Sequence, residues 1–295
     1  MSYKSKFKNY GLGLGLRRDL KETILNEIQE EQNDFSWLEI VPENFIYLGA
    51  KKQFDFQEIL ATQLPVIPHG VNLSIGTASK EVNKDFYLLD GLKELFQEIK
   101  PPWFSDHLSC TRINGHYLQE LIPLPFNQEM VNIVVDNIKF LQDYLQLDFL
   151  VENPSYYMKY ESNTLTELEF INSVVDKANA GILLDVNNIF VNLTNHNDYQ
   201  YQDFINNLDL SRVVQVHIAG HAENYFSWLA QKQLKILDTH AAQIRQEVLD
   251  IFAYLLSQTS INAVLLERDS NFADFAQLKI EMQALKQIMQ QGALV

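Results

Sequence analysis

The chain has 295 residues, and a single barrel of alternating strands and helices, which usually takes about 250, fits within that length. Hydrophobic residues make up 46% of the chain and charged residues 21%, a composition that excludes a disordered polar protein. The net charge of −15 disfavours general binding to nucleic acid, because the protein as a whole repels phosphate groups.

Eight short runs rich in β-forming residues predict strands, and they recur along the whole chain. In order they are Tyr10–Leu16, Phe35–Val41, Pro65–Leu73, Trp103–Ser109, Asp148–Asn153, Gly181–Val186, Val213–Ala219 and Ala263–Arg268. Between them lie segments with apolar residues at every third or fourth position, which predict helices; the clearest are 20–29, 89–99, 130–145 and 244–259. This alternation predicts an α/β fold, a single (β/α)8 TIM barrel over residues 1–295.

The first predicted strand carries glycines at Gly11, Gly13 and Gly15. Their G-x-G-x-G spacing is too short for a dinucleotide-binding fingerprint. We therefore interpret them as positions in a barrel strand that allow either close packing or a tight exit of the chain.

Cys110 is the only cysteine, so an internal disulfide and a thiolate-rich metal site are excluded, and we expect a cytoplasmic protein. No run of about 18 apolar residues is present, so no membrane span is expected. The basic first ten residues are followed by too few apolar ones for an export signal.

Most of the predicted strands end in polar side chains. In chain order these are Glu43 and Asn44, His69, Asp106 and His107, Glu152 and Asn153, Asp185 with Asn187 and Asn188, His217 and His221, and Glu267 with Arg268 and Asp269. The carboxyl ends of barrel strands meet at one face, where active sites form. A single residue of this kind is more commonly structural, hydrogen-bonded to a loop.

Six of these side chains together would be costly to bury at one mouth, and metal ions would remove that cost. The six are His69, His107, Glu152, Asp185, His217 and Glu267. Asp238 and His240 lie two residues apart after the seventh strand, and with Asn188 they could hold a further metal. Donors of nitrogen and oxygen only are suited to iron, manganese or zinc.

Other chemically active residues are weaker candidates. His116 and His196 lie in polar stretches and are expected at the surface, and Cys110 is expected to pack. The aromatic stretches 154–160 and 224–231 either pack or line a peptide groove.

The motifs around these residues resemble the multinuclear non-heme iron-dependent oxidases, a family of the xylose isomerase-like TIM barrel superfamily that includes the catalytic subunit of methanobactin biosynthesis. The resemblance runs almost end to end: GLGLR at 13–17, PEN at 42–44, HGVNLSIG at 69–76, SDHLS at 105–109, ENPS at 152–155, LLDVNN at 183–188, QVHIAGH at 215–221, DTH at 238–240 and LLERD at 265–269.

The resemblance implies a barrel that holds two or three iron ions in mixed ferrous and ferric states, with zinc or manganese possible after purification. It implies use of dioxygen to oxidise a residue, often cysteine, of a ribosomally made precursor peptide in natural-product biosynthesis, with a partner protein that recognises the peptide. It assigns His69 and His107 to one iron, Glu152 to a bridge, Asp185, His217 and Glu267 to the second iron, and Asn188, Asp238 and His240 to the third. Glu152, Asp185 and Glu267 are then the expected catalytic residues.

Two other classes of function remain open from the sequence. The ligand order also resembles endonuclease IV, a trizinc phosphodiesterase, and more loosely the sugar isomerases; the acidic charge and Asn188 in place of a histidine argue against the nuclease. The third possibility is a non-catalytic, peptide-binding scaffold with structural metals.

Overall fold

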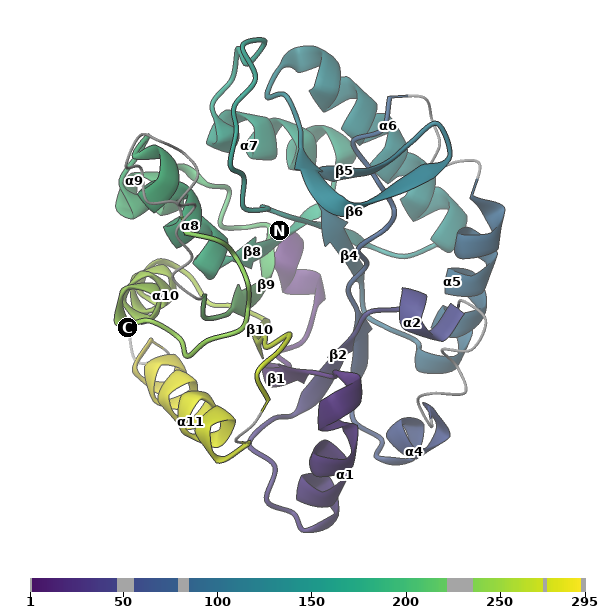
Figure 1. Ribbon diagram of the computed structural model, residues 1–295, viewed down its shortest axis with the longest axis vertical. Helices are drawn as coiled ribbons and strands as arrows, with labels where there is room; N and C mark the ends of the chain where they lie inside the picture. Colours follow the sequence, from purple (N-terminus) through teal and green to yellow (C-terminus); the bar gives the residue numbers. More distant parts are fainter. Residues whose placement is uncertain (1, 47–55, 79–84, 222–235, 273–274, 293–295) are drawn as a thin grey trace.

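The computed structural model describes residues 2–46, 56–78, 85–221, 236–272 and 275–292. Within these ranges, eight parallel strands form a nearly closed barrel with helices around it, and the chain begins near the centre of the view in Figure 1. The hydrogen-bonded order is β3-β2-β1-β10-β9-β8-β7-β4, and a bridge between His69 and Ser105 joins the two end strands.

The predicted TIM barrel is confirmed, and each barrel strand lies inside its predicted range. The strands are β1 Gly11–Gly15, β2 Trp37–Ile40, β3 Val66–Pro68, β4 Phe104–His107, β7 Phe149–Glu152, β8 Gly181–Asp185, β9 Val213–Ile218 and β10 Ala263–Leu266. The third is much shorter than predicted, because Val71 and Asn72 donate their backbone N–H groups to Glu43 and not to a neighbouring strand.

The four clearest predicted helices are also present, as α1 Lys21–Gln29, α5 Phe86–Ile99, α6 Gln128–Leu145 and α10 Gln246–Gln258. The other helical segments are η1 Tyr3–Lys6, η2 Arg18–Leu20, α2 Glu43–Ile46, α4 Phe56–Ala61, α7 Glu167–Ala178, α8 Val186–His196, α9 Tyr201–Asn207 and α11 Phe275–Gly292. In the described ranges no helix combines the length and the apolar character needed to cross a membrane.

A hairpin that the sequence analysis did not predict follows β4. It pairs β5 Ser109–Ile113 with β6 His116–Pro123 in antiparallel fashion. Asn114 and Gly115 form the turn with φ angles of 51° and 79°. An Asn-Gly pair between two β-forming runs is a strong hairpin signal, so this element could have been predicted.

The barrel interior is apolar near the strand starts. A buried cluster that includes Trp37, Trp103 and Leu265 fills it, and Tyr3 and Phe7 from the amino-terminal segment pack against that cluster. This leaves the carboxyl ends of the strands as the polar end of the barrel.

Gly13 allows the indole of Trp37 to lie directly against β1. A Cβ atom on Gly13 would be 2.2 Å from the Trp37 ring, and the Trp37 indole N–H donates to the Gly11 carbonyl at 3.1 Å. The packing role predicted for the glycine-rich strand is confirmed at Gly13.

We expect Gly13→Ala to destabilise the fold by about 1–3 kcal/mol, because the fully buried Trp37 has no free space into which it can move. Urea unfolding followed by tryptophan fluorescence measures the change. Met158→Ala, at a side chain that is 48% exposed, is the control and should stay within about 0.5 kcal/mol. Equal stability of Gly13→Ala and the wild type would contradict the packing argument.

Candidate metal centre

Six buried side chains meet at the carboxyl ends of the barrel strands. His107, Glu152 and Asp185 are the last residues of β4, β7 and β8, and the others follow or nearly end their strands. The six are His69, His107, Glu152, Asp185, His217 and Glu267, none more than 9% exposed. The barrel therefore brings together side chains that lie up to two hundred residues apart in the chain.

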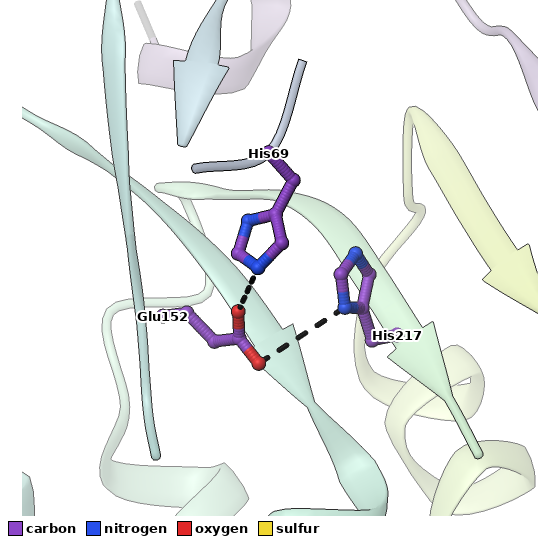
Figure 2. Close-up of side chains that lie close together, drawn as sticks. All are labelled: His69, Glu152 and His217. Atoms are coloured by element: carbon purple, nitrogen blue, oxygen red, sulfur yellow. Dashed lines mark ion pairs between the residues drawn. The ribbon is translucent and has the colours of Figure 1, made fainter. Parts of the chain in front are cut away.

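Glu152 lies between three imidazoles. Its Oε2 atom is 3.0 Å from His69 Nε2 and 3.4 Å from His107 Nε2, while its Oε1 atom is 4.0 Å from His217 Nδ1. Figure 2 shows this carboxylate between His69 and His217. One carboxylate with its two oxygens directed to different histidines has the arrangement of a bridging ligand.

A second group surrounds Glu267. Its Oε2 atom is 3.0 Å from His217 Nδ1 and 3.3 Å from His240 Nδ1. His240 Nε2 lies 2.6 Å from Asp238 Oδ1 and 3.9 Å from Asp185 Oδ2. The segment that carries Asp238 and His240 thus returns to the mouth, as the sequence analysis expected.

Several of these donors are held by the protein through one atom and present another to the site. Glu267 Oε1 accepts from Arg17 at 3.0 Å, and Asp185 Oδ1 accepts from the Asn188 backbone N–H at 2.6 Å. Asn188 donates its amide N–H to the Asn153 carbonyl at 3.1 Å, which directs its Oδ1 atom away from that contact. Protein contacts therefore fix the orientation of the groups that face the site.

Apart from the ion-pair contacts within the cluster, the atoms on the inner side have no hydrogen-bond partner in the described part of the chain. They are Glu152 Oε2, Asp185 Oδ2, Asn188 Oδ1, His217 Nδ1, His240 Nε2 and Glu267 Oε2. Buried polar atoms without partners are costly, and all six are nitrogen or oxygen donors. The donor set thus fits divalent or trivalent metal ions such as iron, manganese or zinc.

Three combinations of side chains place ligand atoms within 4.8 Å of one another. They are His69 with Glu152 and His217, Glu39 with His217 and Glu267, and Asp185 with His240 and Glu267. Because they share residues, the geometry is that of one cluster of adjacent sites.

The titratable groups show that the cluster needs positive charge. Burial alone would lower the pKa of His107, but Glu152 and Asp106 raise it to about 9. Burial alone would raise the pKa of Glu152, but His107 and His69 hold it at about 2. Burial raises the pKa of Asp185 well above its usual value. Metal cations would supply the charge that protons otherwise supply here.

Glu39 is a residue of the site that the sequence analysis missed. It lies inside β2, 1% exposed, and its Oε2 atom is 2.9 Å from His217 Nε2 and 2.5 Å from Gln215 Nε2. Gln215 accepts in turn from the Trp103 indole N–H at 2.8 Å. A glutamate inside the apolar run WLEI was the available signal, although it does not lie at the end of the strand, where active-site residues are expected.

His221 lies beside the cluster and contacts it through Asn187. His221 Nδ1 is 2.7 Å from Asn187 Oδ1, and Asn187 donates to Asp238 Oδ1 at 2.8 Å. The His221 ring also stacks on Phe190. His221 therefore contacts the predicted ligand Asp238 only through Asn187.

Other polar residues from the strand ends serve different contacts. Arg268 pairs with Glu281 at 2.8 Å, and Asp269 accepts from Arg17 at 2.7 Å. Asn44 is exposed. Asp106 accepts the backbone N–H of Leu73 at 3.0 Å.

His116 is exposed, as predicted. The prediction for His196 was wrong, because it is half-buried, stacks on Tyr156 and contacts the Tyr156 carbonyl at 2.8 Å. Cys110 is part of β5, with its thiol near the Arg112 carbonyl. The aromatic stretch 224–231 lies outside the described residues.

The loop after Glu152 is held by a buried carboxyl group. Glu167, at the start of α7, accepts from Tyr156 at 3.2 Å, Tyr199 at 3.3 Å and Asn192 at 3.3 Å. Burial raises the pKa of Glu167 to about 7, although these hydrogen bonds lower it. The aromatics of 154–160 therefore pack at Tyr156.

A cavity of about 520 Å³ opens above the cluster. Its walls include site residues as well as the hairpin, and they are formed in part by His69, His107, Asn188, Asp238, His240 and Glu267 together with Thr111 and Gln119. The cavity connects the candidate metal centre with the outside of the barrel.

The fold and the site define the class: a TIM barrel with a candidate metal centre at its mouth. The solved structure of an L-ribulose 3-epimerase has a TM-score of 0.60 at 13% identity, with 96% of this chain and 95% of that chain covered. A xylose isomerase-like TIM barrel protein from Mycobacterium smegmatis in complex with magnesium has a TM-score of 0.57 at 10% identity, with 98% and 100% covered. At these identities the likeness shows the fold alone.

Within this class, the chain belongs to the family of RiPP precursor modification enzymes MbnB/TglH/ChrH, which matches residues 11–290. The resemblance predicted from the motifs is thereby confirmed. The chain is also 36% identical over 300 residues to a UPF0276 protein of Pasteurella multocida, covering 96% of this chain and 95% of that protein. A UPF0276 protein of Neisseria meningitidis serogroup C is 39% identical over 273 residues, with 92% of each chain covered.

We expect Glu39→Gln to weaken metal binding by about 10–100-fold, because His217 loses the carboxylate that orients its ring. Competition with a chelator, followed by metal analysis, measures the affinity. Glu94→Gln, at an exposed glutamate of α5, should bind metal like the wild type. Unchanged affinity in Glu39→Gln would show that Glu39 does not support the centre.

We expect Glu167 to make the fold less stable as the pH rises. Its pKa in the folded state, about 7, lies above the unfolded value of 4.5, so its contribution is fully present below pH 4.5 and is lost as the pH passes 7. The melting temperature should therefore fall more between about pH 5 and about pH 8 in the wild type than in Glu167→Gln. An equal fall in both proteins would contradict this assignment.

Proposed function

We propose that the chain is a multinuclear, iron-dependent oxidase that uses dioxygen to modify a residue, cysteine foremost, of a ribosomally made precursor peptide. The observation that carries this proposal is the convergence of six buried donor atoms that have no hydrogen-bond partner outside the cluster, in a member of a precursor-modifying family. The family supports a peptide substrate, and the donor chemistry supports the metals.

In this proposal each ion has its own set of ligands. His69 and His107 would hold the first ion, and Glu152, which contacts both histidines, would be shared with the second. The second ion is held by Asp185, His217 and Glu267, and the third by Asn188, Asp238 and His240. An amide oxygen is a weaker ligand than imidazole, so the third site is expected to be only partly filled.

The irons, when bound, supply the redox chemistry and lower the pKa of a coordinated thiol. The chain's own residues position and enclose the reaction. Arg17 holds the outer oxygen of Glu267, and the Asn188 backbone holds the outer oxygen of Asp185, so that each carboxylate offers its inner oxygen. The cavity admits a side chain to the cluster, and the apolar filling of the barrel excludes water from the other end.

The cavity above the cluster also fits the expected mode of delivery. A site recessed in a barrel mouth receives one side chain of an extended substrate more readily than a folded protein. We therefore propose that a partner protein recognises the rest of the precursor and presents it here. Nucleic acid is an unfavourable substrate for a chain with net charge −15.

We expect protein purified without oxygen from iron-supplemented cells to contain about two or three irons per chain. Asp185→Asn should lose iron, because it removes a ligand charge, whereas His116→Gln, at an exposed histidine, should retain it. Mass spectrometry of metals and Mössbauer spectroscopy measure content and coupling. Stoichiometric zinc without iron would contradict the oxidase and favour metal-dependent hydrolysis.

A second variant distinguishes a catalytic function from that of a peptide-binding scaffold. Glu152→Gln is expected to abolish oxygen consumption with a cysteine-containing precursor while the circular dichroism spectrum of the barrel persists. Wild-type levels of peptide modification in this variant would indicate structural metals in a binding scaffold.

A further inference from the structure

One edge of the hairpin formed by β5 and β6 is covered by the segment that follows His69. The backbone N–H groups of Thr111 and Arg112 both donate to Ser74 Oγ, at 2.8 and 2.9 Å. The Thr77 hydroxyl donates to the Arg112 carbonyl at 2.9 Å. The outer side of β5 is therefore occupied by the protein itself.

The distal end of the hairpin is tied to helix α5. Asp85, the N-cap residue of that helix, accepts from both Arg112 Nη1 and the Tyr117 hydroxyl at 2.5 Å. Arg112 and Tyr117 are also register partners across the hairpin. These contacts hold the hairpin in place, and Figure 1 shows it next to β4.

The outer strand of the hairpin contains a large bulge. Cys110 pairs with Ile122 and Arg112 pairs with Tyr117, so the four residues 118–121 stand opposite the single residue Thr111. Gln119 has a φ of 55°, in the left-handed region. No backbone hydrogen bond joins residues 118–121 to an element outside the hairpin in the described part of the chain.

The bulge lies at the cavity over the candidate metal centre. Gln119, Glu120 and Leu121 line that cavity together with His107 and Glu267. Leu121 is 36% exposed. Bulges are frequent beside active sites, where they redirect side chains, and here the bulge directs three consecutive residues to the mouth.

We propose that the bulge at residues 118–121 is the docking edge for an extended stretch of the precursor peptide. The peptide's main chain pairs with the backbone groups of residues 118–121, an apolar side chain contacts Leu121, and a neighbouring residue enters the cavity. This inference rests on the proposed function. An extended peptide fits because it presents alternating donors and acceptors to a strand edge, which gives affinity with little dependence on sequence.

The decisive variant is deletion of residues 119–121. It leaves Leu118 alone opposite Thr111, so the two flanking register pairs can persist in a regular hairpin. None of the deleted residues is a proposed metal ligand, so iron content and melting temperature should remain near those of the wild type. Ile113→Ala, at an exposed residue of the same hairpin that does not line the cavity, is the matched control.

The probe is a library of random peptides that each carry one central cysteine, selected against the full-length, iron-loaded protein. Fluorescence anisotropy gives the Kd of enriched peptides. The deletion should weaken binding by about tenfold or more, and Ile113→Ala should not. Amide exchange in residues 118–121 of the wild type should slow when peptide is added.

Unchanged Kd in the deletion variant would overturn the inference, as would failure of the wild type to enrich any peptide, since main-chain recognition tolerates many sequences. Peptide binding through the bulge by a protein that contains no iron would contradict the proposed function and leave the docking edge in place. Iron loading together with peptide binding that does not depend on the bulge would contradict the docking edge and leave the proposed function in place.

Discussion

The candidate centre depends on how its polar side chains are held: the protein binds one polar atom of the side chain, and another polar atom faces the mouth. His69 places Nδ1 3.0 Å from Ser105 Oγ and directs Nε2 inward, while His217 contacts Glu39 through Nε2 and directs Nδ1 inward. The two histidines thus use opposite ring atoms for the same purpose. A ligand fixed in this way loses little conformational entropy when an ion binds, which favours a preformed centre.

This arrangement requires a rigid frame, and the packed apolar end of the barrel provides it for the polar end. Near the strand starts the interior is filled by aromatic and aliphatic side chains and covered by the amino-terminal segment. The strand ends carry the charged groups. A buried cluster of carboxylates and imidazoles is costly unless protons or metal cations offset its charge, so the feature that marks the site also fits the proposed metal ions.

The sequence predicts the barrel well because each strand is a short, continuously buried run, and such runs stand out between amphipathic helices. It also predicts the strand-end residues, since parallel strands end at one face. Glu39 could not be predicted in this way, because its part in the site depends on which way a residue inside a strand points. It also depends on Gln215 in β9, which is separated from β2 by two other strands. The bulge in β6 could not be predicted either. The register of the hairpin is fixed by contacts of Arg112 and Tyr117 with Asp85, which lies outside the hairpin.

Asp185 has a double position: it is the last residue of β8 and the N-cap of α8, where its side chain accepts the Asn188 N–H. The proposed metal centre and the first turn of that helix consequently share one carboxylate. The Asp185 carboxylate would interact with an ion through Oδ2, and it interacts with the partial positive charge of the helix terminus through Oδ1. Filling or emptying the centre is therefore mechanically connected to α8, and through Asn188 and Asn192 on that helix to the loop that follows Glu152.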